Sequence, residues 1–250
     1  MIRDKLIASL ALSAALLLGG CATTTANNPK DPIEGFNRAM FSFNEGLDAA
    51  IIKPVSKGYD AVMPPPAKSG VINFFGNISD VFIALNNLIQ GKPAEAASDV
   101  GRVLINTTIG ILGLFDVASD AGLEKHEEDF GQTFGRWGIG PGAYVVIPFF
   151  GPRNVRDTAG LILDATVNPI GNIQHTPTRN AFIATHLISK RADLLSADKI
   201  IEEAALDKYS YLRDAYVQQR NYLVNDGVLP KKRDEPVAPS IPFTLKDIFK

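Results

Sequence analysis

The single cysteine of this 250-residue sequence stands at position 21, directly after Leu18-Gly19-Gly20. Two basic residues within the first five precede an almost wholly apolar run over residues 6–18, which is the pattern of a secretory signal. The run is shorter than the about 20 residues that a membrane-spanning helix needs. A thiol that follows small residues at this spacing is the substrate of lipoprotein acylation. We therefore predict a signal peptide at residues 1–20 and a covalent N-terminal lipid on Cys21.

Uncharged amide side chains form the second chemically suggestive pattern. Residues 71–90 predict an amphipathic helix with one broad apolar face. Its opposite stripe carries Asn73, Asn77, Asp80 and Asn87, although asparagine is a poor helix former and solvated faces usually carry lysine and glutamate. The stripe fits hydrogen bonds between neighbouring helices or a solvated face. It also fits the wall of a water-filled groove whose outer side meets lipid tails, and both interpretations stay open.

A second helix is predicted to begin at Asp31-Pro32-Ile33-Glu34, which has the pattern of a capping box. Asn37 and Asn44 lie on one side of this helix, opposite a face rich in phenylalanine, and Pro54 is expected to end or kink it. Two helices with apolar and amide-rich sides favour a membrane-embedded body with a wet interior. We therefore predict that both asparagines line this interior together with the stripe.

Three later segments complete the predicted architecture. Residues 103–115 carry no charge and span about 20 Å as a helix, which suits a core element or one that enters a single leaflet. Residues 131–152 contain six glycines and predict a structured loop with a short hairpin. Helix resumes over 153–166, and 178–225 predicts one broken helix or two consecutive ones. The fold class expected is mainly α.

The domain boundaries follow from these patterns. Residues 21–30 are small and polar and predict a lipidated tether. Residues 31–226 predict one helical domain, and 227–250 predict a mobile tail rich in proline and lysine. With Cys21 acylated, no cysteine is left for a disulfide.

Composition argues against several classes of function. The formal net charge of −2 gives no electrostatic basis for binding nucleic acid. The sequence lacks the Gly-x-Ser-x-Gly nucleophile motif and a phosphate-binding loop. Three histidines without the spacing of metal ligands argue against a metal site. We expect no enzyme activity, and no cofactor besides the lipid on Cys21.

Several blocks of sequence, in the same order, resemble the MlaA/VacJ family of outer-membrane lipoproteins, which act in phospholipid asymmetry. The resemblance covers approximately residues 31–225. Its blocks are Asp31-Pro32-Ile33-Glu34-Gly35-Phe36-Asn37-Arg38, Phe43-Asn44, Asn73-Phe74-Phe75, Leu88-Ile89-Gln90-Gly91-Lys92, Phe130-Gly131-Gln132-Thr133, Arg136-Trp137-Gly138, Tyr144-Val145-Val146-Ile147-Pro148 and Gly151-Pro152 with Arg156-Asp157.

The resemblance implies a ring-like helical protein in the inner leaflet of the outer membrane, anchored from the periplasmic side and associated with a trimeric porin. Its amphipathic channel would pass mislocalised phospholipids from the outer leaflet to a periplasmic lipid-carrier protein. The glycine-rich segment, with Gly131, Trp137, Gly138 and Gly140, would be a gating or porin-facing loop, and a static loop fits its composition equally well.

A second class of function fits the same residues. A lipoprotein could dock a porin or another envelope partner without transporting lipid. The shape around the asparagine stripe distinguishes the two classes, because a flat and open stripe favours the adaptor and a concave lumen favours the conduit.

Overall fold

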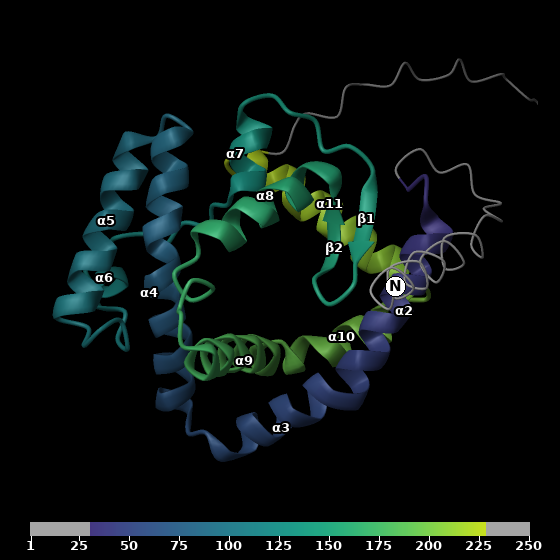
Figure 1. Cartoon of the computed structure of the whole chain (residues 1–250), viewed down its shortest axis with the longest axis horizontal. Helices are drawn as coiled ribbons and strands as arrows, with labels where there is room; N and C mark the ends of the chain where they lie inside the picture. The colour runs from purple at the N-terminus through teal and green to yellow at the C-terminus, as the bar shows by residue number, and fades with distance from the viewer. Residues whose placement is uncertain (1–30, 229–250) are drawn as a thin grey trace, which may run out of the picture.

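The computed structural model describes residues 31–228 of the chain. The predicted signal peptide, Cys21, the tether and nearly all of the predicted tail therefore lie outside the described residues. Helices dominate the described part, and its one sheet is a two-stranded hairpin. The predicted mainly helical, single-domain fold is confirmed. In Figure 1 the helices run around an open middle, which gives the ribbon a ring-like outline.

The N-terminal arc of the ring consists of α2 (Glu34–Leu47), the π-helical turn η1 (Asp48–Ile52) and α3 (Lys53–Val62). Pro54 is the second residue of α3 and follows directly on the π-helical turn. The chain therefore passes Pro54 in helical conformation, through one widened turn, and the helix does not end there.

The capping box predicted at the start of α2 is wrong. Ile33 occupies the cap position and no side chain caps the helix. Asp31 is instead fully buried, where its carboxylate accepts hydrogen bonds from Asn37 Nδ2 at 2.7 Å and from the Tyr209 hydroxyl. Glu34 forms an ion pair with Arg38, one turn further along α2. The buried carboxylate thus binds the side chains of Asn37 and Tyr209 in place of the end of the helix.

Two long helices form one side of the molecule. α4 (Pro65–Ile89) and α5 (Pro93–Thr108) pack together across a tight turn at Gly91, whose φ of +80° favours glycine. The uncharged segment 103–115 is the end of α5 followed by an exposed loop, after which α6 (Val117–Asp120) begins.

The glycine-rich segment contains more helix than its composition predicts. The short hairpin is confirmed: β1 (Tyr144–Ile147) pairs antiparallel with β2 (Gly151–Asn154). The first part, however, is α7 (Phe130–Arg136) where a loop was expected. The helix forms because the Asp129 side chain caps it, accepting from the Gln132 amide at 2.8 Å.

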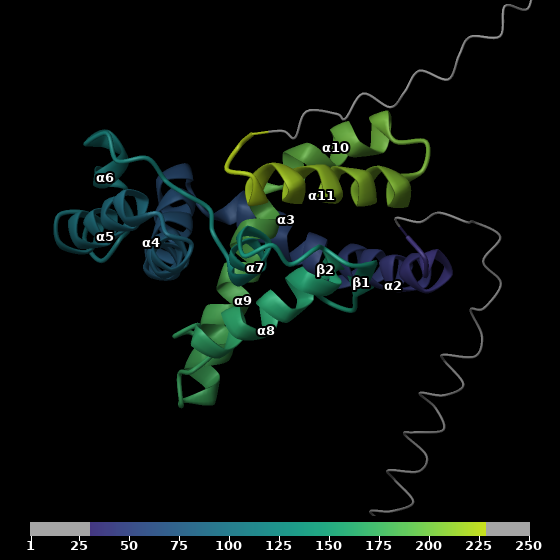
Figure 2. The ribbon, with the colours of Figure 1, turned by 90° about the horizontal axis from the view of Figure 1, so that it is seen from above.

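The C-terminal half adds α8 (Val155–Val167), α9 (Thr176–Asp193), α10 (Leu195–Ala204) and α11 (Lys208–Val224). Region 178–225 thus folds as three helices, where one broken helix or two were predicted. Seen from above, α8 and α9 lie on one side of the ring and α10 and α11 on the other, with α4 to α6 at one end (Figure 2).

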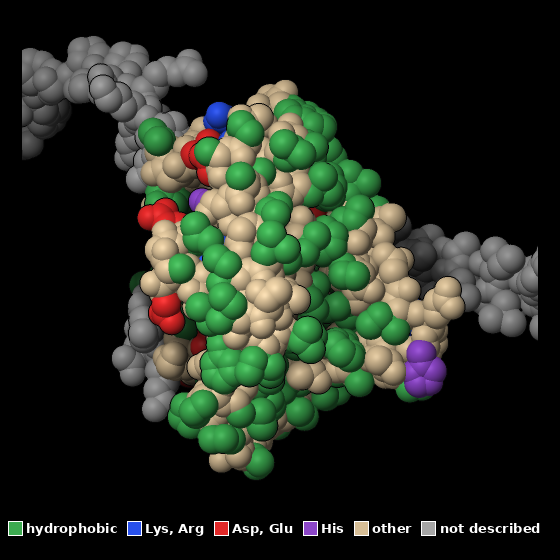
Figure 3. Space-filling model, turned by 90° about the vertical axis from the view of Figure 1, so that its left-hand side faces the viewer, with side chains coloured by type: hydrophobic (Ala, Val, Ile, Leu, Met, Phe, Trp, Pro, Cys, Tyr) green, Lys and Arg blue, Asp and Glu red, His purple; other side chains and the backbone are tan. Residues whose placement is uncertain are grey.

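Burial in the described residues is inverted relative to an ordinary soluble protein. Fully buried side chains are mostly polar or charged, while buried apolar side chains are few, and Tyr144, Val146 and Tyr209 form a small cluster where α2, β1 and α11 meet. Many large apolar side chains are exposed. Figure 3 shows them spread over the face that α4, α5 and α6 present, with the visible charged groups gathered near one edge.

The exposed large apolar residues of α4, α5 and the loop before α6 include Val81, Leu85, Leu88, Val100, Leu104, Ile109, Ile111, Leu112, Leu114 and Phe115. An apolar surface of this extent indicates contact with a lipid or protein partner. Among the described residues, no helix combines the length and the apolarity needed to cross a bilayer.

Candidate functional site

A cavity of about 700 Å³ lies on the inner side of α4, opposite α8, α9 and α11. The segment between α6 and α7 closes one of its sides. Polar and charged side chains dominate the lining, which is Ile72, Asn73, Gly76, Asn77, Ser79, Asp80, Phe82, Ile83, Arg102, Asn106, Asp116, Lys125, His126, Glu127, Glu128, Asp129, Gln132, Asp164, Asn168, His186, Ser189, Lys190, Asp193, Leu194, Arg220 and Leu223. A polar lumen therefore lies behind an apolar exterior.

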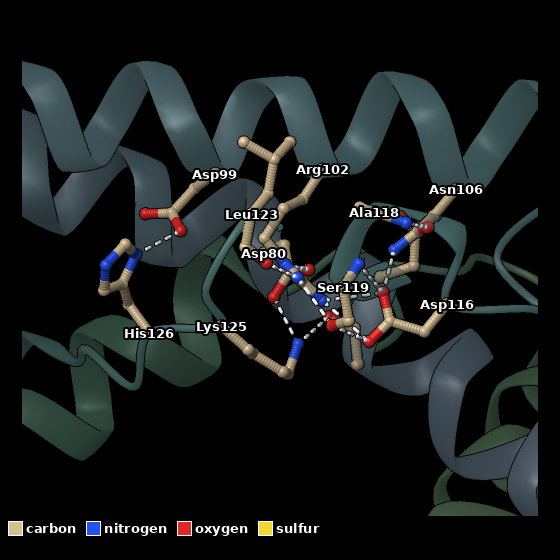
Figure 4. Close-up of polar contacts among 12 residues, drawn as sticks. Asp80, Asp99, Arg102, Asn106, Asp116, Ala118, Ser119, Leu123, Lys125 and His126 are labelled. Carbon is tan, nitrogen blue, oxygen red and sulfur yellow. Dashed lines mark hydrogen bonds and ion pairs between the residues drawn. The ribbon is translucent and has the colours of Figure 1, made fainter. Parts of the chain in front are cut away.

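Arg102 of α5 organises the wall of this cavity between α4 and α6 (Figure 4). Its guanidinium, only 1% exposed, donates to both carboxylate oxygens of Asp116 at 2.9 and 3.0 Å, and to Asp80 Oδ2 at 3.3 Å. It also donates to Ser119 Oγ at 3.0 Å and to the Leu123 carbonyl at 2.6 Å. A buried guanidinium is tolerated because its donors find partners in this way.

The Asp116 carboxyl shows how strongly this cluster favours the charged form. Burial alone would raise its pKa, but hydrogen bonds from Ser119, Asn106 and Arg102 outweigh burial and lower the pKa to about 2. Asp80 is paired on its other side with Lys125, which reaches in from the segment before α7. These residues therefore fix α4, α5 and α6 as one rigid wall.

Three of the predicted lining residues do line the cavity, namely Asn73, Asn77 and Asp80. Asn77 donates to Thr107 Oγ1 of α5 at 2.9 Å, and Asn73 donates to the Leu114 carbonyl at 3.3 Å. Both interpretations of the stripe thus apply together, because the same residues join α4 to its neighbours and face the lumen.

Asn87 does not line the cavity. It is 1% exposed and donates to Asp99 Oδ2 of α5 at 2.7 Å, while the other oxygen of Asp99 lies 2.7 Å from His126 Nδ1. Near the end of α4, toward the turn at Gly91, the stripe contacts α5 without bordering the cavity. The prediction that Asn87 faces the lumen is therefore wrong, and its side chain instead joins α4 to α5.

Asn37 and Asn44 are likewise not among the lining residues. Each uses its amide to bind the backbone of β1 and the turn that follows, with one donated and one accepted hydrogen bond. The bonds join Asn37 to the Tyr144 carbonyl and the Val146 amide at 3.1 and 2.8 Å, and Asn44 to the Ile147 carbonyl and the Phe149 amide at 3.0 and 2.8 Å. The predicted lining role of both residues is wrong, because their side-chain amides bind the hairpin and attach it to α2.

A second buried ionic cluster closes the far side of the cavity. Arg220 of α11 donates to both oxygens of Asp129 at 2.7 and 2.9 Å and to Asp157 Oδ2 at 2.8 Å. Asp157 also accepts from Tyr216 and Arg156, and these bonds, with Arg220, hold the pKa of its carboxyl below the ordinary value despite burial. The cluster ties α7, α8 and α11 together.

Asp164 of α8 behaves differently. Burial, with the nearby negative charge of Asp129, raises the pKa of its carboxyl to about 6. Its one hydrogen bond within the described part of the chain comes from the Phe130 amide at 3.3 Å. The lining therefore contains an incompletely paired carboxylate.

Also in the lining is His186 of α9. Burial and Lys190 lower the pKa of its imidazole, and its ring stacks on that of Phe75 with the centroids 4.4 Å apart.

The residues predicted for the gating loop lie in different settings. Gly131 is inside α7, where an added Cβ would meet Asp157 and Arg220 at 2.7 Å, so its role in the structure is close packing. The Trp137 indole donates to the Ile89 carbonyl at 3.2 Å while its side chain stays half exposed. Gly138, with φ of +90°, and Gly140 have open space where a side chain would stand. A gating role for this segment remains a prediction.

Arg102, Arg220, Asp157 and Asp164 were missed as site residues. Arg102 has one available signal, since it is the only charged residue between Asp99 and Asp116 in the sequence. A lone charge in so apolar a segment indicates a buried partner. Arg220 and Asp164 stand in ordinary amphipathic contexts, and nothing in the local sequence distinguishes them from surface charges.

Comparison with known proteins agrees with this architecture. The model of the MlaA lipoprotein family matches residues 29–223. The intermembrane phospholipid transport system lipoprotein MlaA of Escherichia coli (strain K12) and that of Shigella flexneri are each 36% identical over 97% of both chains. The Haemophilus influenzae protein of the same name is 30% identical over 90% of this chain and 92% of its own.

A solved structure from work on the "Structural basis for maintenance of bacterial outer membrane lipid asymmetry" is also similar. It superposes with a TM-score of 0.69 at 33% identity, covering 78% of this chain and 99% of its own. Fold and cavity together define a class of ring-like helical proteins with a polar cavity and an apolar exterior. The chain belongs to the MlaA lipoprotein family.

Proposed function

We propose that this protein removes mislocalised phospholipids from the outer leaflet of the outer membrane and passes them through its cavity toward the periplasm. The observation that carries the proposal is the combination of a charged and amide-lined cavity with an exposed apolar face on the same pair of helices. A phospholipid headgroup moving through hydrocarbon meets a large desolvation cost, which polar side chains in a lumen offset. The relatives named for intermembrane phospholipid transport support the same function.

Several parts of the proposal concern the surroundings of the protein. Acylated Cys21 would anchor the chain in the outer membrane from the periplasmic side, as two or more acyl chains give stable attachment. A trimeric porin would hold the ring in the bilayer, and a soluble periplasmic lipid-carrier protein would receive the phospholipid. No catalytic step is required, because the lipid leaves chemically unchanged.

The non-transporting adaptor remains the second candidate. Its supporting observation is the exposed apolar face over α4, α5 and α6, which a protein partner would also cover. A flat asparagine stripe would have favoured it. The concave wall around Asn73, Asn77 and Asp80 favours the conduit.

A bulky side chain placed in the cavity distinguishes the conduit from the adaptor. Ser79 faces the cavity from α4, and its hydroxyl bonds only the Phe75 carbonyl one turn back, so α4 does not need it. Ser79→Trp should fill part of the lumen. Ser42→Trp is the matched control, because Ser42 is an exposed serine of α2 that does not line the cavity.

The experiment measures outer-leaflet phospholipid in a strain that lacks the family member. Wild type and Ser42→Trp should restore a low level, whereas Ser79→Trp and Cys21→Ala should not, at equal protein abundance. Full activity of Ser79→Trp would contradict passage through this cavity and favour the adaptor. An unchanged outer leaflet in the deletion strain would contradict the transport function altogether.

A further inference from the structure

The charges that line the cavity are not balanced once their ion pairs are assigned. Asp80 and Asp116 pair with Arg102, and Asp80 also with Lys125. Two further pairs in the wall are Glu128 with Lys92 and Asp129 with Arg220. Within residues 31–228, the lining groups without an ionic partner are three carboxylates, Glu127, Asp164 and Asp193, and one amine, Lys190.

Hydrogen bonding in the wall is unbalanced in the same direction. Asn77 and Gln132 line the cavity and are 8% and 3% exposed, so both side chains are more than nine-tenths buried. Each leaves its amide oxygen without a hydrogen-bond partner in the described part of the chain. An unsatisfied buried acceptor costs free energy that a donor would recover. The wall thus has an excess of acceptors, but each of these two oxygens has less than 1 Å² exposed, so the groups that a ligand in the cavity meets are the unpaired charges.

The position of the single unpaired amine is also informative. Lys190 and Asp193 are three residues apart on α9 and therefore lie on the same side of the helix. They present one positive and one negative charge side by side to the lumen, and no ion pair joins them in the described structure. Such a pair is complementary to a ligand that itself carries a phosphate and an ammonium group close together.

A metal ion fits this wall less well than an organic cation. Among residues 31–228 no three histidine, cysteine or acidic side chains are grouped closely enough to hold a metal ion. The unpaired carboxylates come instead from α8, from the end of α9 and from the segment before α7. They are spread along the lumen, as a moving headgroup would need.

We propose that the cavity selects phospholipids by headgroup charge, favouring zwitterionic lipids with a primary ammonium group over lipids of net negative charge. This inference rests on the proposed transport function. The headgroup ammonium donates to the unpaired carboxylates, and the phosphate lies against Lys190. A headgroup that lacks the ammonium brings only its negative phosphate past three carboxylates and is slowed.

The test compares two lipids at the cell surface in a Gram-negative strain that lacks its own family member and carries the full-length chain. Surface phosphatidylethanolamine is labelled with a membrane-impermeant amine reagent, and surface phosphatidylglycerol is oxidised at its diol with periodate. Both products are then quantified by mass spectrometry of extracted lipid. Wild type should clear phosphatidylethanolamine about threefold or more in preference to phosphatidylglycerol, a factor typical of a partly screened charge pair.

Two sets of variants change the selectivity in opposite directions. The triple variant Glu127→Gln, Asp164→Asn and Asp193→Asn should bring the two clearances close together. Lys190→Gln should widen the preference, because it removes the unpaired positive charge. Glu124→Gln is the matched control, since Glu124 is an exposed carboxylate on the same segment as Glu127 and does not line the cavity.

The outcomes separate this inference from the proposed function. If wild type clears neither lipid, the transport function fails. If wild type clears both equally, transport stands and charge selection is overturned. A triple variant that is abundant but keeps the wild-type ratio, or a Glu124→Gln variant that changes it as much, also overturns the inference. If the triple variant is not abundant, Lys190→Gln decides, and an unchanged ratio overturns it.

Discussion

Asn37 and Asn44 bind one strand of backbone with the same pair of hydrogen bonds, two helical turns apart. Each side chain accepts from one backbone amide and donates to the carbonyl two residues before it. Seven residues of helix span about 10.5 Å and three residues of extended chain span about 10 Å, so the two sites on α2 match the two on β1 and its turn. The two side-chain amides thus supply the hairpin with the donors and acceptors that a neighbouring strand would provide.

Removing the more buried of the two amides should loosen the hairpin and lower stability. Asn37 is fully buried, so Asn37→Ala leaves the Val146 amide and the Asp31 carboxylate with fewer partners. We expect a loss of about 2 kcal/mol in the free energy of unfolding. Denaturant unfolding in detergent measures it. Asn221→Ala, an exposed asparagine of α11, should change stability by less than about 0.5 kcal/mol, and equal effects in the two variants would contradict the prediction.

Helical periodicity predicted much of the fold because the amphipathic faces are long. The helix expected over 71–90 is present as α4, extended toward its N-terminus by one and a half turns. The hairpin was predicted from the apolar run at 144–147 between glycines, and β1 has these bounds. α7 was missed because glycine is a poor helix former, and here the contact of α7 with α8 overrides propensity.

The site was predicted only in part for a different reason. The stripe on α4 is a single face in the sequence, but α5 packs along it from Asn77 to Asn87 and the cavity borders only part of it. Asn73, Asn77 and Asp80 therefore reach the cavity, whereas Asn87 meets Asp99. Which part of a polar face meets solvent depends on where the next helix crosses it, and local sequence does not contain this information.

The buried charge of Arg102 should be essential for the wall of α4, α5 and α6. Arg102→Met retains much of the side-chain volume but leaves Asp116 without an ionic partner and Asp80 with Lys125 alone. We expect destabilisation of about 3–5 kcal/mol, since it leaves uncompensated buried charge. Lys68→Met, which breaks the exposed pair with Asp60, is the control and should cost under about 1 kcal/mol. A small effect of Arg102→Met in thermal unfolding would show that the network contributes little.

Asp164 should make the protein less stable at neutral pH than in mild acid. Its folded-state pKa of about 6 lies above the unfolded value of about 3.9, so its contribution is fully present below pH 4 and is lost as the pH rises through 6. Asp164→Asn should therefore stabilise the protein at pH 8 by about 2 kcal/mol and leave it nearly unchanged at pH 4. Unfolding measured at both pH values tests the sign, and an equal effect at the two would contradict it.

Two glycine substitutions should have opposite effects on stability. At Gly160 of α8 an added Cβ would lie 2.3 Å from the backbone nitrogen of Gly131, so Gly160→Ala must push α7 away from α8. We expect a loss of about 2 kcal/mol or more, as for other overpacked contacts. Gly58 of α3 has no atom within 4 Å of the place that an added Cβ would take, so Gly58→Ala should stabilise the helix by about 0.5–1 kcal/mol. Thermal unfolding of both variants against wild type measures the difference, and a neutral Gly160→Ala would show that α7 and α8 separate without cost.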